Sequence, residues 1–210
     1  MLESVPESRP SDGRRARGMR SRTAILALAV QMASREGLEG LTMGALAGEL
    51  AVPKSSVFAL FGSKQELQLA TLAAARRILI EQVVLPAAPA AEGVQRLRAL
   101  GEAWCDYLTS GVFAGGCFLC AASAEMDGRP GPVRDAVAAV MSEWLAILAA
   151  NIDAAVSSGA FQTGLDSAAM AFRLNALGMA ANWRYQLFGD GSGVAHARAA
   201  WRAEIDAASS

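Results

Sequence analysis

The sequence predicts an all-α protein of about nine helices, in which a small N-terminal three-helix domain precedes a larger helical domain. Beyond residue 20, apolar residues recur three and four positions apart, and no segment alternates apolar and polar residues as a strand would. Glycines and prolines separate these periodic segments. Hydrophobic residues make up 53% of the 210 residues, but charged residues interrupt the long apolar runs, so no membrane span is expected.

Charge is distributed unevenly along the chain, although the net charge is only −1. Residues 14–64 contain eight Lys and Arg and three Glu, whereas residues 65–210 contain ten Arg and fourteen acidic residues. A basic segment joined to an acidic body indicates one module that binds a polyanion and a second module with another task. An uneven surface without functional meaning is the alternative that charge alone leaves open.

The N-terminal residues 1–19 are rich in Pro, Ser, Gly and Arg and show no periodicity, so we expect a disordered basic arm there. Its arginines could reach the backbone or the minor groove of DNA. No apolar segment directly follows a short charged one, as it would in a secretory signal. We therefore expect the protein in the cytoplasm, without a membrane partner.

Two helices open the N-terminal domain. The first is expected from Ser21 to Glu36, with apolar residues on one face and Gly37 as its C-terminal cap. The second begins after Thr42, a residue type that favours the N-cap because its hydroxyl can accept a backbone N–H of the first turn.

A third, short helix is expected from Pro53 to Leu60, after a tight turn. Val57 and Phe61 are four residues apart and are expected to face inward, which leaves the other side of this helix free. Two helices joined in this way form a helix-turn-helix, whose second helix fits the major groove of DNA. Serines and basic residues can bond bases or phosphates, and apolar side chains can contact thymine methyl groups. The residues expected to contact DNA are Thr42, Lys54, Ser55, Ser56, Phe58, Ala59, Leu60, Lys64, Arg20 and Arg22.

The fourth helix is expected to begin at Ser63, which with Glu66 has the form of a capping box, and to run to about Val84. Beyond it, apolar periodicity continues in longer segments separated by Gly- and Pro-rich turns. Asp166 is a favourable N-cap for the penultimate helix. The remaining helices are expected at about residues 92–110, 117–126, 133–158, 166–188 and 194–206.

The segment of about residues 20–70 resembles the N-terminal signature of the TetR family of transcriptional regulators. The resemblance rests on Leu41-Thr42-Met43, on Val52-Pro53-Lys54-Ser55-Ser56-Val57-Phe58 and on Phe61-Gly62-Ser63-Lys64. It implies a DNA-binding domain over residues 20–66 and a helical effector-binding and dimerisation domain over residues 67–210. The implied function is a ligand-responsive regulator, more commonly a repressor, that binds a palindromic double-stranded DNA operator as a homodimer.

Three positions depart from the usual pattern of the family. Phe58 stands where tyrosine is common and Leu60 where histidine is common, and those usual residues often touch phosphate. Ala51 replaces a glycine that is common in the turn, and if this position needs a positive φ, alanine costs about 1 kcal/mol there. The weakened phosphate contacts motivate an alternative: a helical, dimeric ligand-binding or scaffold protein that has lost specific DNA binding.

The resemblance also implies two sites in the second domain. An effector pocket is implied within it, and its aromatic candidates favour a small apolar or aromatic ligand, although such residues also occur as plain core. The last two helices are implied to pair with those of a partner chain. The candidate pocket residues are Trp104, Tyr107, Phe113, Phe118, Met141, Trp144 and Phe172. The candidate interface residues are Ala176, Ala180, Trp183, Phe188 and Trp201.

Other chemistries have weaker support in the sequence. Cys117 and Cys120 form a C-x-x-C pair, which leaves a redox role open, but buried free cysteines are the better interpretation. No second ligand pair accompanies them, so no metal is expected. The glycines of Gly189-x-Gly191-x-Gly193 follow a helix rather than a strand and lack dinucleotide-binding spacing. We therefore expect neither a cofactor nor an enzymatic activity.

Overall fold

The computed structural model describes the backbone of residues 10–210 and the side chains of residues 22–210. The described residues form nine helices and no strand, when the continuous run α4–η1–α5 counts as one helix. The predicted all-α class and number of helices are therefore confirmed. In chain order the elements are α1 (Pro10–Gly40), α2 (Met43–Glu49), α3 (Lys54–Phe61), α4 (Lys64–Leu79), the π-helix η1 (Ile80–Val84), α5 (Leu85–Ala87), α6 (Val94–Thr109), α7 (Phe118–Met126), α8 (Pro132–Ser157), α9 (Ser167–Phe188) and α10 (Ser192–Ala208).

α1 begins earlier than the sequence predicts. It starts at Pro10, so the expectation of a disordered arm is wrong for residues 10–19, and residues 1–9 lie outside the described residues. Extending an existing helix costs far less than nucleating one, and the Arg and Ala residues of this segment are good helix formers. Gly37 has a non-helical backbone (φ 79°, ψ 165°), which confirms that the regular part of the first helix ends there.

The helix-turn-helix has the core and the caps that the sequence predicts. Val57 and Phe61 of α3 are buried, in a core that also contains Leu46 of α2. The exposed Thr42 caps α2, and Ser63 caps α4, each by accepting a backbone N–H of the first turn at 3.1 Å. These contacts fix the start of each helix, so the outer side of α3 is held in a set direction.

The turn between α2 and α3 contains Ala51, whose φ is 51°, the only positive φ of a non-glycine residue in the described chain. Its Cβ incurs a steric cost in this conformation that glycine avoids. We expect Ala51→Gly to raise the free energy of unfolding by about 1 kcal/mol in urea denaturation. Ala59→Gly, at an exposed helical position of α3, is the control and should lower it by about 1 kcal/mol. A decrease for both variants would contradict the strain at Ala51.

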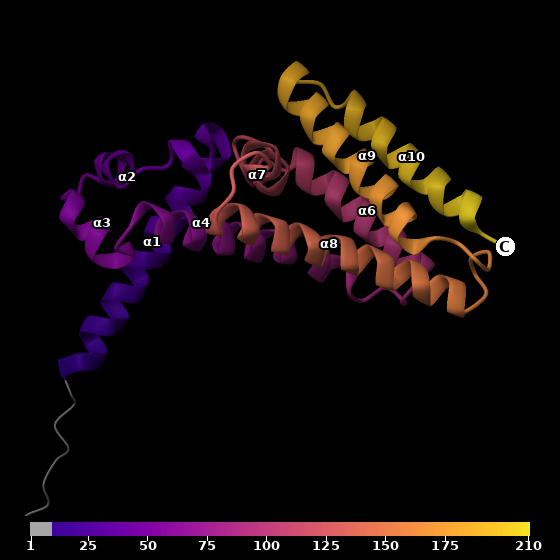
Figure 1. Ribbon diagram of the computed structural model, residues 1–210, viewed down its shortest axis with the longest axis horizontal. Helices are drawn as coiled ribbons and strands as arrows, with labels where there is room; N and C mark the ends of the chain where they lie inside the picture. The colour runs from indigo at the N-terminus through magenta and orange to yellow at the C-terminus, as the bar shows by residue number, and fades with distance from the viewer. Residues whose placement is uncertain (1–9) are drawn as a thin grey trace, which may run out of the picture.

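The larger domain extends away from the helix-turn-helix on long helices (Figure 1). α4 leads out of the small domain and packs on α1 and α8. α9 and α10 form a closely packed pair, and both contact α6. α7 is short and bridges the two parts, since it contacts α1, α4 and α8.

α8 is long and apolar enough to cross a membrane by length and composition, with a mean hydropathy of 1.4 over its most apolar window. It instead packs against α4, α7 and α9. Leu148 and Ile152 of α8 are fully buried, and Glu143 accepts a 2.6 Å bond from Arg76 of α4. These contacts place one side of α8 in the core of the larger domain.

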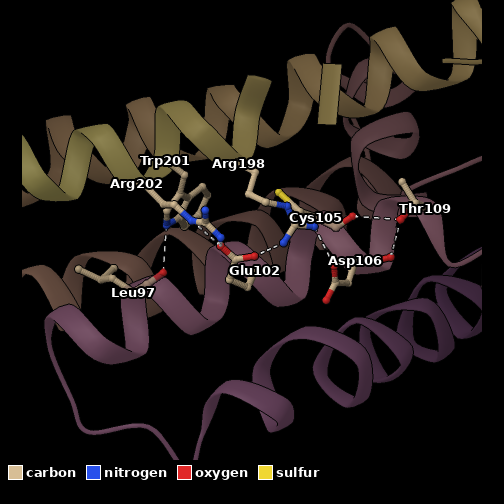
Figure 2. A network of polar contacts seen from close by, with 8 residues as sticks. All are labelled: Leu97, Glu102, Cys105, Asp106, Thr109, Arg198, Trp201 and Arg202. Atoms are coloured by element: carbon tan, nitrogen blue, oxygen red, sulfur yellow. Dashed lines mark hydrogen bonds and ion pairs between the residues drawn. The ribbon is translucent and has the colours of Figure 1, made fainter. Parts of the chain in front are cut away.

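A network of polar contacts fastens α10 to α6 (Figure 2). The Arg198 guanidinium pairs with Glu102 and with Asp106, the latter at 2.7 Å, and Arg202 pairs with Glu102 at 2.7 Å. Beside these ion pairs, the Trp201 indole donates to the Leu97 carbonyl oxygen at 3.0 Å.

Trp201 was expected at a dimer interface, and that prediction is wrong. Its side chain is only 3% exposed and packs over Gly101, where an added Cβ would lie 2.5 Å from Trp201 Nε1. Helical periodicity shows that Trp201 shares a face with other apolar residues of α10, but it does not show which partner covers that face.

Candidate nucleic-acid interface and effector cavity

The outer face of α3 carries the side chains expected to contact DNA. The side chain of Phe58 is 56% exposed, although phenylalanine rings are usually buried in the core of a protein. Leu60 is half-buried and packs against the core, so it is less available to a partner than predicted. The remaining exposed candidates on this helix are Lys54, Ser55, Ser56 and Ala59. The face offers two hydroxyls, one ammonium and one apolar ring to a partner.

Lys64, also expected to bond phosphate, is tied to the end of α1. Its Nζ donates to the carbonyl oxygen of Glu39 at 2.7 Å and to Glu39 Oε2 at 3.0 Å. The bond from Lys64 holds the pKa of the Glu39 carboxyl below its ordinary value. Of the two predicted arginines, Arg22 is exposed, with its guanidinium 5.2 Å from the Phe61 ring, and the side chain of Arg20 lies outside the described residues. A phosphate contact by Lys64 would have to replace its bonds to Glu39.

Glu125 of α7 joins the larger domain to the helix-turn-helix. Its carboxylate accepts the backbone N–H groups of Leu38 at 2.7 Å and Glu39 at 2.8 Å, just after α1 is interrupted. A Cβ at Gly37 would lie 2.7 Å from Glu125 Oε1, so the glycine allows this close approach. The role of Glu125 was not predicted. Its two partners lie 87 and 86 residues earlier in the chain, so the contact leaves no local signal in the sequence.

A second set of contacts joins α1 to the segment before α7. Gln31 Nε2 donates to the carbonyl oxygen of Val112 at 2.7 Å, and Gln31 Oε1 accepts the backbone N–H of Ala114 at 3.2 Å. Gly115 passes so close to α1 that an added Cβ would lie 1.7 Å from the Ser34 carbonyl oxygen. α7 and the segment before it are therefore both held against the DNA-binding domain.

We expect Glu125→Ala to lower the free energy of unfolding by about 1–3 kcal/mol, because two backbone N–H groups lose a charged acceptor. Urea denaturation gives the magnitude, and hydrogen exchange at Leu38 and Glu39 should become faster. Glu125→Gln is the control: it retains an acceptor oxygen and should lose less stability. Equal losses for the two variants would show that these bonds do not stabilise the protein.

An interior cavity lies among α4, α6, α7, α8 and α9. Trp104, Met141 and Trp144, which were predicted as pocket residues, line it, and so does Asn175, which was not predicted. The free volume is only ≈ 10 Å³, about what a single water molecule needs. Nothing in the sequence distinguishes Asn175, because the side of α9 that faces inward is decided by packing.

The other pocket candidates separate into two groups. Tyr107, Phe113 and Phe118 are buried in an adjoining aromatic cluster, with ring centroids 6.2 Å apart for the first pair and 5.8 Å for the second. Phe172 was expected in the pocket, and this prediction is wrong: it is 68% exposed and lies on the outer groove between α9 and α10. Its position one turn before Ala176 places it on the outward side of α9.

The two cysteines of the C-x-x-C pair lie at the start of α7 and line the cavity. The Cys117 thiol accepts a bond from the Cys120 thiol and backbone N–H groups of α7, which lower its pKa, whereas the same bond and burial raise the pKa of Cys120. Together with Cys105, both are free and buried, as the preferred interpretation expects. No second element is crosslinked through them.

A larger, open pocket of ≈ 340 Å³ adjoins the cavity between α7, α8 and α9. Met126, Met141 and Met179 line it, and Asp127 and Arg134 lie on its wall. Met141 borders both spaces, so its flexible side chain is the partition between the pocket and the cavity.

An apolar stripe follows the outer side of α9. Its members are spaced three or four residues apart, and the sequence analysis missed Leu187, which is 62% exposed. Trp183 and Phe188, predicted for the interface, are 59% and 57% exposed and stack edge to face with ring centroids 5.7 Å apart. The stripe consists of Phe172, Ala176, Ala180, Trp183 and Leu187.

Comparisons of sequence match both halves of the chain. The profile of bacterial regulatory proteins of the tetR family matches residues 25–71. The profile described as Tetracyclin repressor-like, C-terminal domain, matches residues 93–201, which is just over half of the chain. No curated protein matches the sequence.

Solved structures share the fold. A TetR transcriptional regulator from Chloroflexus aurantiacus J-10-FL is 20% identical, with a TM-score of 0.85 over 91% of this chain and 96% of that one. A regulator from Saccharomonospora viridis, solved with choline, is 21% identical, with a TM-score of 0.76 over 90% and 96% of the two chains. AibR, solved with isovaleryl coenzyme A and operator DNA, is 22% identical, with a TM-score of 0.64 over 79% and 85%. With the two profile matches, this shared fold shows that the chain belongs to the TetR family of transcriptional regulators.

Proposed function

We propose that this protein is a cytoplasmic, ligand-responsive repressor that binds a palindromic operator as a homodimer. The observation that carries the proposal is the outer face of α3, which stays exposed because Val57 and Phe61 are buried beneath it. In this proposal residues 20–66 bind DNA, and residues 67–210 bind the effector and the partner chain. The serines would meet base edges or phosphates, Lys54 would meet phosphate, and Phe58 would meet a thymine methyl group.

The apolar stripe of α9 supports the homodimer. Two large rings and a leucine that are more than half exposed lie on the same helix face as two alanines, which allow close helix approach. Pairing α9 and α10 with those of a second copy would cover this stripe. Two recognition helices related by a two-fold axis could then occupy successive major grooves, about 34 Å apart.

The cavity and the adjoining pocket support an effector site. Their walls are mainly apolar and aromatic, which favours a small apolar or aromatic molecule that is released unchanged. Regulators of the same fold were solved with choline and with isovaleryl coenzyme A, so this architecture accepts different small molecules. The effector would bind better to a conformation in which the recognition helices no longer match successive grooves, so DNA affinity would fall.

Fluorescence anisotropy with the promoter region beside the protein's own gene tests this function. We expect specific binding by the wild type, and weaker binding by Lys54→Ala, whose salt dependence should be shallower by about 0.9 for each lost phosphate contact. Arg77→Ala is the control: Arg77 lies on α4 and pairs with Glu81 one turn later in η1, and this variant should leave binding unchanged. Retention of random DNA only, lost at moderate salt, would instead support the non-DNA-binding scaffold.

A further inference from the structure

Three buried polar atoms without a hydrogen-bond partner belong to residues that line the interior cavity. They are Trp104 Nε1, Trp144 Nε1 and Asn175 Oδ1, and all three residues line that cavity. Each side chain is more than nine-tenths buried. A buried polar atom left unpaired costs about 1–3 kcal/mol, so three of them at one place mark a surface built for a partner rather than for stability.

The three atoms define the hydrogen-bonding pattern of that partner. The two indole N–H groups can only donate, and the amide oxygen can only accept. The complementary group therefore accepts two bonds and donates one. A hydroxyl group offers this pattern on one atom, and a carboxamide offers it on its oxygen and nitrogen.

The absence of charged side chains around the cavity further restricts the chemical class of the head group that can bind there. None of the residues lining the cavity has a permanently charged side chain, whereas Asp127 and Arg134 lie on the wall of the open pocket. A carboxylate or an ammonium group moved into the cavity would lose its hydration without gaining a counter-ion. The cavity therefore selects a neutral head group.

The sizes of the cavity and of the open pocket indicate where the rest of the bound ligand lies. The cavity of ≈ 10 Å³ holds about one water-sized group, so a head group larger than a hydroxyl needs Met141 to move, whereas the adjoining pocket of ≈ 340 Å³ reaches the lower end of the range for small-molecule sites. Met141 separates the two spaces, and Met179 of the pocket accepts a 3.3 Å bond from Asn175 Nδ2. Rotation of the Met141 side chain would connect the pocket to the polar atoms of the cavity.

We propose that the effector is a neutral, mainly apolar molecule whose hydroxyl or carboxamide group bonds Trp104, Trp144 and Asn175 in the cavity while its apolar body occupies the methionine-lined pocket. This assignment rests on the proposed function, since it names the chemistry of the effector. The assignment is more specific than an apolar effector site, because a purely apolar site would also bind a hydrocarbon of the same size.

Isothermal titration calorimetry with four probes of one shape tests the assignment: 2-naphthol, 2-naphthamide, 2-naphthoate and naphthalene. We expect both neutral, polar probes to bind at least about tenfold more tightly than the carboxylate and the hydrocarbon, since one buried hydrogen bond with a polar partner is worth about that factor. Tighter binding of 2-naphthoate or of naphthalene, or no binding of either polar probe, would overturn the proposal.

Asn175→Leu and Trp144→Phe each remove one of the unpaired atoms while keeping an apolar side chain. We expect each to weaken 2-naphthamide binding about tenfold, with a melting temperature unchanged or higher for Asn175→Leu, because a costly buried acceptor is lost. Leu85→Ala, at an exposed position of α5 that lines neither the cavity nor the pocket, is the control and should leave probe affinity unchanged. A large drop in melting temperature with unchanged probe affinity for Asn175→Leu would show a structural role and overturn the assignment.

The same titrations separate this proposal from the proposed function. Probe binding is measured without DNA. Binding of 2-naphthamide as expected, without binding of an operator, would contradict the proposed repressor function and support the proposed chemistry of the effector. Binding of the operator, without binding of either polar probe, would support the DNA-binding function and contradict the proposed chemistry of the effector.

Discussion

Ala180→Glu is expected to convert the proposed dimer into a monomer and to lower operator affinity by about a hundredfold. Ala180 is exposed at the centre of the apolar stripe of α9, between Ala176 and Trp183. In a symmetric dimer that covers this stripe, the two new carboxylates would be buried near one another without a counter-ion, which costs several kcal/mol. A monomer presents one recognition helix to one half-site, so it loses the affinity gained from joining two half-sites.

Sedimentation velocity gives the association state of this variant, and anisotropy with the operator gives its affinity. The matched control is Ala139→Glu, which adds the same charge at an exposed position of α8 away from the stripe. This control should remain dimeric and bind operator as the wild type does. A dimeric Ala180→Glu protein with unchanged affinity would exclude α9 as the interface.

Trp201→Ala is expected to lower the free energy of unfolding by about 3–5 kcal/mol, the usual effect of removing a fully packed tryptophan. The indole packs over Gly101, donates to Leu97 and stacks edge to face on Trp104 with ring centroids 6.0 Å apart. Its loss would leave a cavity between α6 and α10 and free an acceptor. Urea denaturation measures the change at a protein concentration at which both proteins have the same association state.

Trp183→Ala is the matched comparison, since it removes the same side chain from a position that is 59% exposed. It should cost less than about 1 kcal/mol in a monomer and weaken dimer association instead. The opposite result, with Trp183→Ala the less stable monomer, would reverse the assignment of the two tryptophans. The pair therefore separates a core residue from an interface residue that the sequence cannot tell apart.

Apart from the earlier start of α1, local signals in the sequence predicted the helices and their caps correctly. Thr42, Ser63 and Asp166 cap helices as expected, because capping depends on residues only three positions apart. Val57 and Phe61 are buried for a similar reason: their spacing places both on one side of a short helix. These signals predict helices, and the resemblance to a known family then predicted that the first helices form a DNA-binding domain.

The errors concern which neighbour covers a helix face. Phe172 and Trp201 both lie on apolar faces, and only the packed helices show that the first points outward and the second into α6. Asn175 and Glu125 were missed because their roles arise from contacts with residues distant in sequence. Periodicity gives the face of a residue, but the choice among several helices as partner is a property of the whole domain.

The length of α7 has a consequence for how a bound molecule is detected. Cys117 and Leu119 at its start border the cavity, and Glu125 near its end bonds two backbone N–H groups of the DNA-binding domain at 2.7 and 2.8 Å. Such bonds weaken sharply beyond about 3.2–3.5 Å, and nine helical residues form a stiff rod only about 13 Å long. If α7 moves as a unit, a displacement of about 1 Å at the cavity would lengthen both bonds beyond this range. Under the proposed function, the response would then depend on a threshold distance, and a molecule too small to displace the start of α7 would bind without releasing the carboxylate.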